Sequence, residues 1–198
     1  MSATEANGWT IFGPHVRGRK CGSCKLCCTL VPVELREGHK PSGVRCQHLK
    51  RTGCGIYATR PRPCQAWSCR WLMDATTADL KRPDLAGYAI DPMLDTILID
   101  GRPAEVIQIW CDPARRDAHR DPALRAWLLE MHARFHLLAI VRWDSSDGLF
   151  LAPPAMNADQ DGTWFEHDSG LTSKEAMRAK LAEVGAVGVL DQLTGRGR

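Results

Sequence analysis

The sequence has no long run of apolar residues. The first twenty residues scatter Trp9, Ile11 and Phe12 among charged residues, glycine and proline, so they hold no apolar stretch of signal-peptide length. No later stretch approaches the roughly 18–20 uninterrupted apolar residues that a membrane helix needs. We therefore predict a cytoplasmic protein with no membrane partner.

The motifs of several common protein classes are also missing. There is no phosphate-binding glycine loop, no dinucleotide-binding glycine fingerprint, no internal repeat and no low-complexity tract. The 198 residues are 44% hydrophobic and 25% charged, which is ordinary for a globular protein and argues against extensive disorder. A chain of this length forms one domain or two small ones.

Acidic residues are scarce in the first part of the chain. Residues 1–73 contain 12 Lys and Arg but only 3 Asp and Glu, a net charge of +9, whereas residues 74–198 contain 14 and 20, a net charge of −6. A basic segment can bind nucleic acid, but here the basic residues are interleaved with cysteines and form no stripe. Metal-bound thiolates would offset this charge, so we expect local compensation and no nucleic-acid partner.

Cysteine is scarce after residue 69, where Cys111 is the only one of the nine. In a cytoplasmic protein, closely spaced cysteines are more often metal ligands than disulfides. A disulfide framework and a thioredoxin-like redox pair are the alternatives. The clustered cysteines, which we predict to be the metal ligands, are Cys21, Cys24, Cys27, Cys28, Cys46, Cys54, Cys64 and Cys69.

The spacing of these cysteines fits two kinds of metal site. A Cys-x-x-Cys turn brings two sulfurs to one ion, and tetrahedral zinc takes four such ligands. Three cysteines at two-residue spacing with a distant fourth beside a proline also hold iron–sulfur clusters, and Cys64 follows Pro63. The adjacent Cys27 and Cys28 favour two sites or one polynuclear site. Eight cysteines make two sets of four, but the spacing does not assign the sets.

The segments CGSCKLCC, CQHL and GCGIYATRPRPCQAWSC give the chain a resemblance to a known family. Over about residues 20–72 it resembles the CxxCxxCC, or YkgJ-like, cysteine-cluster family, a zinc- or iron-chelating domain that also occurs in flagellin lysine-N-methylases. The resemblance implies that the same eight cysteines bind zinc or an iron–sulfur cluster. It implies no particular reaction, so whether the chain is an enzyme stays open.

The distribution of cysteine, glycine and proline divides the chain into three segments. We expect a leader (1–20), a cysteine-cluster metal-binding module (21–73) and an α+β part (74–198), separate from the module or continuous with it. The predicted fold class is α+β: a small cysteine-rich, metal-organised N-terminal module packed on a short antiparallel sheet with two or more helices. The expected strands are 87–90, 96–99, 106–110, 137–143, 149–152 and 163–166, and the expected helices are 122–135 and 172–184.

Residues near the cysteines have weaker predicted roles. We interpret His48 as a turn residue or a partner of a sulfur, and Trp67 and Trp71 as apolar cover over the site. Tyr57, Arg60 and Arg62 are expected to pack near the cluster and neutralise its charge.

Two further features carry little functional signal. His132 and His136 are four residues apart on the predicted helix, but Ala133 stands where a zinc protease has its catalytic glutamate. Cys111 ends an expected strand and is interpreted as a small buried hydrophobe rather than a nucleophile.

The leading hypothesis is a metal-binding protein that chelates zinc or an iron–sulfur cluster, with its biological role unassigned. The alternative is an iron–sulfur redox protein, or an accessory to protein side-chain modification similar to flagellin lysine-N-methylases. A third hypothesis is a binding module that presents Arg60, Arg62 and Arg70 to an acidic protein partner.

Overall fold

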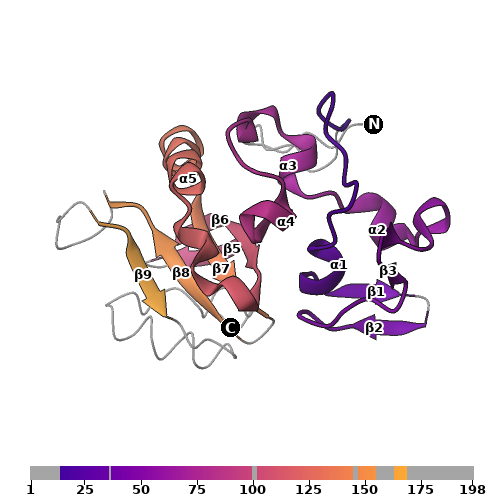
Figure 1. The fold of residues 1–198 in the computed structure, drawn as a ribbon. Helices are drawn as coiled ribbons and strands as arrows, with labels where there is room; N and C mark the ends of the chain where they lie inside the picture. The colour runs from indigo at the N-terminus through magenta and orange to yellow at the C-terminus, as the bar shows by residue number, and fades with distance from the viewer. Residues whose placement is uncertain (1–13, 36, 100–101, 145–146, 155–162, 169–198) are drawn as a thin grey trace.

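The computed structural model describes residues 14–35, 37–99, 102–144, 147–154 and 163–168 (Figure 1). These residues form short helices, two small β-ribbons and one larger sheet, which confirms the expected α+β class. The expected helix 172–184 lies outside the described residues. Within the described part of the chain, no helix is long and apolar enough to span a membrane.

The cysteine-rich segment consists of short elements, because glycine and proline interrupt it repeatedly. Strands β1 and β2 pair antiparallel, as do β3 and β4. The elements of this segment are α1 (Cys27–Leu30), β1 (Val33–Leu35), β2 (Gly38–Lys40), β3 (Leu49–Lys50), β4 (Gly53–Cys54), η1 (Tyr57–Thr59), α2 (Arg62–Ala66) and α3 (Arg70–Met73). Two short helices, η2 (Ala75–Thr77) and α4 (Pro83–Ala86), lead on to the larger sheet.

The larger sheet has five strands in the order β5-β6-β7-β8-β9. Its strands are β5 (Tyr88–Ile99), β6 (Arg102–Cys111), β7 (Leu138–Arg142), β8 (Gly148–Ala152) and β9 (Phe165–Asp168). The expectation of an antiparallel sheet holds for three of the four strand pairs, whereas β6 and β7 pair parallel. The reason is that η3 (Pro113–Arg120) and α5 (Pro122–Phe135) carry the chain back across the sheet between these strands.

The expected break between the strands 87–90 and 96–99 is wrong, because β5 runs through Asp91 and Pro92. Ile90 lies opposite Ile109 and Leu94 lies opposite Ile107, so the register shifts between them as in a β-bulge. Pro92 has no amide hydrogen to give the ladder. The carboxylate of Asp91 accepts a hydrogen bond from the amide of Met93 at 2.9 Å and supports the bulge.

Helix α5 covers one face of the sheet and begins and ends as the sequence predicts. The side chain of Asp121 caps it by accepting a hydrogen bond from the amide of Ala123 at 3.2 Å. The main core lies between this helix and the sheet. Its largest fully buried side chains are those of Ile90, Ile107, Ile109, Leu124, Met131, Val141 and Leu151.

The opposite face of the sheet contacts the cysteine-rich segment. Trp110 of β6 packs against Leu30 and Val31, which follow the start of α1. Ala89 of β5 packs against Cys69 and Leu72. Figure 1 accordingly shows α1 to α3 on one side of the molecule and α5 on the other, with the sheet next to α5. The cysteine-rich segment therefore shares buried contacts with the sheet.

The described end of the leader packs on α3. The amide of Val16 donates to the carbonyl of Leu72 at 2.7 Å. The guanidinium of Arg19 donates to the carbonyls of Trp71, Asp74 and Thr77 and lies over the Trp71 ring. These contacts fix the chain immediately before Cys21.

Candidate metal centre

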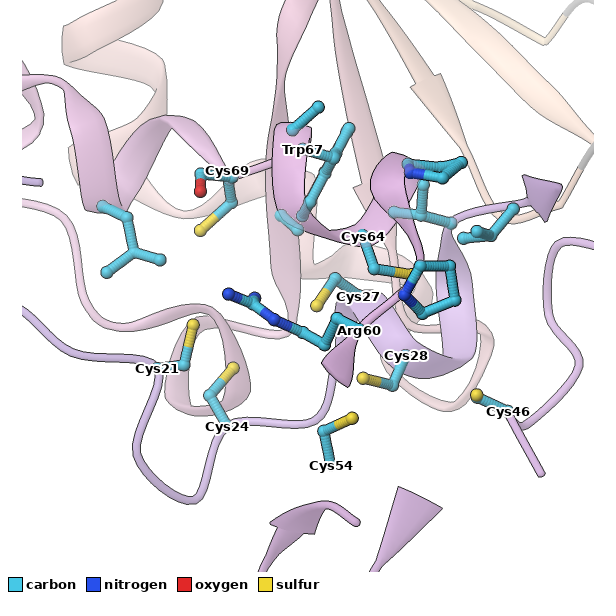
Figure 2. Close-up of a pocket in the computed structure, with 18 of the residues that line it drawn as sticks. Cys21, Cys24, Cys27, Cys28, Cys46, Cys54, Arg60, Cys64, Trp67 and Cys69 are labelled. Carbon is cyan, nitrogen blue, oxygen red and sulfur yellow. The ribbon is translucent and has the colours of Figure 1, made fainter. Parts of the chain in front are cut away.

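All eight predicted cysteine ligands line one cavity of about 430 Å³, and all of them are free thiols (Figure 2). Its walls also include apolar side chains of the bulge in β5 and of the chain around α2, among them Pro63, Trp67, Pro92 and Met93. Side chains as far apart in sequence as Cys21 and Cys69 thus meet in one place.

One group of cysteines gathers around the turn at residues 21–24. The amide of Cys24 donates to the carbonyl of Cys21 at 2.9 Å, and Gly22 takes a φ of +53° that few other residues adopt. Cys69 comes immediately before α3, and its thiol is within electrostatic range of Cys21 and Cys24. Figure 2 shows these three sulfurs on the same side of the cavity.

A second group gathers around α2 and β4. The amide of Cys46 donates to the carbonyl of Cys28 at 2.9 Å, which holds these two segments together. Cys54 ends β4, and Cys64 lies in α2. The thiol of Cys64 is within electrostatic range of Cys28, Cys46 and Cys54.

Cys27 and Cys28 begin α1 and lie where the two groups meet. Cys27 is within electrostatic range of Cys24 and Cys69 of the first group. The side chains of Cys27 and Cys28 also hydrogen-bond to each other, and this bond raises the pKa of Cys27 and lowers the pKa of Cys28.

Burial opposes ionisation of most of these thiols. It raises the pKa of Cys69 to about 12 and also raises the pKa values of Cys21, Cys24 and Cys64. Buried thiolates are stable only beside positive charge, which nearby basic residues or a metal ion can supply.

Basic side chains of the segment point to the cavity. The ammonium of Lys40, only 6% exposed, donates to the carbonyls of Thr29, Pro41 and Val44 and lies within electrostatic range of both neighbouring cysteines of α1. The guanidinium of Arg60 projects among the sulfurs, stacked at 3.9 Å on the ring of Tyr57. Both cations therefore lie beside the cysteines of the cavity.

No metal site is preformed among these side chains. In the part of the chain that the structure describes, no three or more Cys, His, Asp or Glu side chains lie close enough together to hold an ion as placed. The donor set is nevertheless chemically suited to soft metals, since thiolates bind zinc and iron–sulfur clusters. Binding would therefore draw sulfurs together that already share one cavity.

Three neighbours of the cysteines have clear positions. His48 lines the cavity, and its Nε2 atom lies 3.4 Å from Oε1 of Glu37. Trp67 and Trp71 pack against Cys69, as expected for apolar cover, and Trp71 donates to the carbonyl of Leu80 at 3.0 Å.

The hypothesis of a surface of Arg60, Arg62 and Arg70 that binds an acidic partner is not supported for Arg70. Arg70 is only 2% exposed, so α3 does not present it to a partner. Arg60 faces the cysteines, and only Arg62 of the three is exposed. The reason is that residues beside Cys69 are buried against the sheet.

The two remaining sequence features are not part of the site. Helix α5 ends at Phe135, and His136 follows it in a left-handed conformation with a φ of +57°. The rings of His132 and His136 lie edge to face with their centroids 6.3 Å apart, and neither residue lines the cavity of the cysteines. Cys111 is fully buried in the main core, and burial raises its pKa to about 12. The interpretation of Cys111 as a buried hydrophobe is confirmed.

Sequence reasoning missed two residues that shape the cavity. The sequence does not single out Lys40, because an isolated lysine beside Pro41 is typical of an exposed position. Asp91 lies between two expected strands and precedes Pro92, a pattern that favours a turn but also occurs at a bulge.

Comparisons with protein-family models, curated proteins and solved structures gave no match.

Proposed function

We propose that this protein binds metal through its eight clustered cysteines, as zinc ions or as an iron–sulfur cluster. The observation that supports the proposal is the convergence of eight free thiols on one cavity. These thiols come from residues 21–69, whose buried apolar residues form only small clusters together with residues of the sheet. Small segments without a large core of their own recruit metals to complete their folding.

The surroundings of the thiols fit a metal better than a disulfide framework. A divalent ion replaces the thiol protons and supplies the positive charge that buried thiolates need. Arg60 and Lys40 balance the remaining negative charge of a centre with four thiolates. Disulfide formation would leave these two cations beside sulfurs that carry no charge.

The test is the zinc and iron content of the full chain purified without oxygen and without an affinity metal. We expect either zinc or iron with sulfide in stoichiometric amounts, and a lower metal content in Cys21→Ser and Cys24→Ser. Cys111→Ala is the matched control, since this cysteine lies in the main core, and it is expected to keep full metal content. Metal-free wild-type protein, or Cys21→Ser and Cys24→Ser variants with full content, would contradict the proposal.

The apolar wall of the cavity favours a second candidate, an iron–sulfur redox protein or an accessory to side-chain modification. Trp67, Pro92 and Met93 line the cavity, and an apolar shell controls solvent access and therefore the reduction potential of a cluster. This candidate predicts a visible iron–sulfur absorption band that bleaches reversibly on reduction. A colourless zinc protein would exclude it.

A further inference from the structure

The two groups of cysteines are contiguous in sequence only at Cys27 and Cys28. Both residues lie in the first turn of α1, where successive side chains point about 100° apart. The two thiols hydrogen-bond to each other, but their other neighbours differ. Cys27 is near Cys24 and Cys69, whereas Cys28 is near Cys64 and its carbonyl accepts the amide of Cys46.

We infer that the cysteines form two separate four-thiolate centres, one of Cys21, Cys24, Cys27 and Cys69 and the other of Cys28, Cys46, Cys54 and Cys64. The inference rests on the proposed function and adds the ligand set of each centre. Four thiolates complete either a structural zinc site or the ligand set of one iron–sulfur cluster. The count in each group is therefore sufficient without a bridging ligand or a histidine.

The packing of the two groups also differs. Cys69 and Cys21 belong to an apolar cluster with Leu72 and Ala89, so the first group lies against the sheet and α3. The second group is built on α2, β4 and the loop at Cys46. Each group thus has its own supporting elements, and only α1 contributes to both.

Placing two centres side by side requires compensation of charge. Four thiolates around a divalent ion carry a net charge of about −2, so two such centres repel each other. The guanidinium of Arg60 is within electrostatic range of Cys21 in the first group and of Cys28 and Cys64 in the second. It lies where a cation reduces this repulsion.

The competing arrangement is one polynuclear cluster in which Cys27 or Cys28 bridges two metals. The hydrogen bond between their side chains and the electrostatic range between Cys21 and Cys28 are contacts across the two groups. The two arrangements predict opposite behaviour for adjacent variants. Separate centres respond to Cys27→Ser and Cys28→Ser independently, whereas a bridged cluster loses both metals in either variant.

The test uses the full chain, stripped with a chelator and reloaded with zinc under reducing, oxygen-free conditions. Zinc per chain is measured together with the alkylation rate of each cysteine by mass spectrometry, because a zinc-bound thiolate reacts slowly. We expect two zinc ions in the wild type and one in each variant. In Cys27→Ser the thiols at 21, 24 and 69 become reactive while those at 28, 46, 54 and 64 stay protected, and Cys28→Ser gives the converse.

A second pair, Cys69→Ser and Cys64→Ser, repeats the test away from α1. Retained far-ultraviolet circular dichroism shows that the main core has folded in each variant. Loss of both zinc ions, or of protection in both groups, from any one variant overturns the partition while leaving the proposed function standing. The wild-type chain could instead take up no zinc, with its eight thiols alkylated as fast as in the presence of chelator. That result would overturn both the proposed function and the partition.

Discussion

The indole Nε1 of Trp110 donates a hydrogen bond to Oδ2 of Asp91 at 3.1 Å, across the bulge in β5. The same oxygen accepts the indole Nε1 of Trp67 at 3.3 Å. Trp67 follows α2 of the cysteine-rich segment, whereas Trp110 belongs to the sheet. The buried carboxylate of Asp91 therefore ties the wall of the cavity to the scaffold beneath it.

Replacing Asp91 should separate these two parts. Asp91→Ala leaves two indole N–H groups and the amide of Met93 without their acceptor, and we expect a loss of about 3 kcal/mol in the free energy of unfolding. Asp91→Asn keeps an oxygen for the indoles but turns an amide NH₂ toward the Met93 amide, so the loss should be about half as large. Chemical denaturation followed by tryptophan fluorescence measures both.

The matched control for Asp91→Ala is Asp79→Ala, since the carboxylate of Asp79 is exposed. Its effect should stay within about 0.5 kcal/mol, as is usual for surface substitutions. Equal stability of Asp91→Ala and Asp79→Ala would show that the indole contacts carry no stability.

Arg19 should fix the segment that leads into the first group of cysteines. Its guanidinium holds the chain before Cys21 on three carbonyls and on Thr77 Oγ1, the last at 2.7 Å. Arg19→Ala should release this segment, so the amide of Val16 should exchange at least about tenfold faster with solvent. Arg17→Ala, an exposed neighbour, should leave exchange unchanged, and equal rates in both variants would refute the role of Arg19.

Local signals in the sequence predicted some elements well. Asp121, Pro122 and the spacing of the apolar residues mark α5, because capping and amphipathicity are encoded within one segment. The clustered cysteines likewise identify the candidate ligands without any structure. Both predictions depend on residues that are close together in the chain.

Features that depend on distant pairing escaped prediction. The parallel pairing of β6 with β7 is set by how α5 crosses the sheet, and no residue in either strand encodes it. Asp91-Pro92 carries a turn signal that the ladder with β6 overrides. The grouping of the cysteines, too, follows from contacts such as that of Cys69 with the turn at residues 21–24.

Arg60 should affect metal affinity through its charge. Arg60→Gln removes the cation that faces Cys21, Cys28 and Cys64, and we expect zinc affinity to fall about tenfold, which corresponds to roughly 1.4 kcal/mol. Arg60→Lys should recover part of this loss. Competition with a chromophoric chelator measures the affinity, and the exposed Arg62→Gln is the control, expected to match the wild type.

Glu166 gives a stability prediction away from the cysteines. Its carboxylate accepts hydrogen bonds from Arg120, at 2.8 Å, and from Arg125, and it lies 3.5 Å from Nε2 of the buried His119. Burial alone would raise the pKa of Glu166, but these cations lower it to about 2. Glu166→Gln leaves the buried guanidinium of Arg125 without its counter-charge and should reduce the free energy of unfolding by about 3 kcal/mol at pH 7.

The pH dependence of this difference follows from the sign of the shift. A carboxyl group whose pKa is lower in the folded state stabilises the fold above its ordinary pKa of 4.5 and loses that contribution as the pH falls toward 2. The gap between wild type and Glu166→Gln should therefore be constant near neutral pH and narrow below about pH 4.5. The control is Glu130→Gln, at an exposed ion pair with Arg134, which should lose less than about 0.5 kcal/mol in the free energy of unfolding. If the difference between wild type and Glu166→Gln does not narrow in acid, the ionisation of Glu166 does not hold β9 to the two arginines.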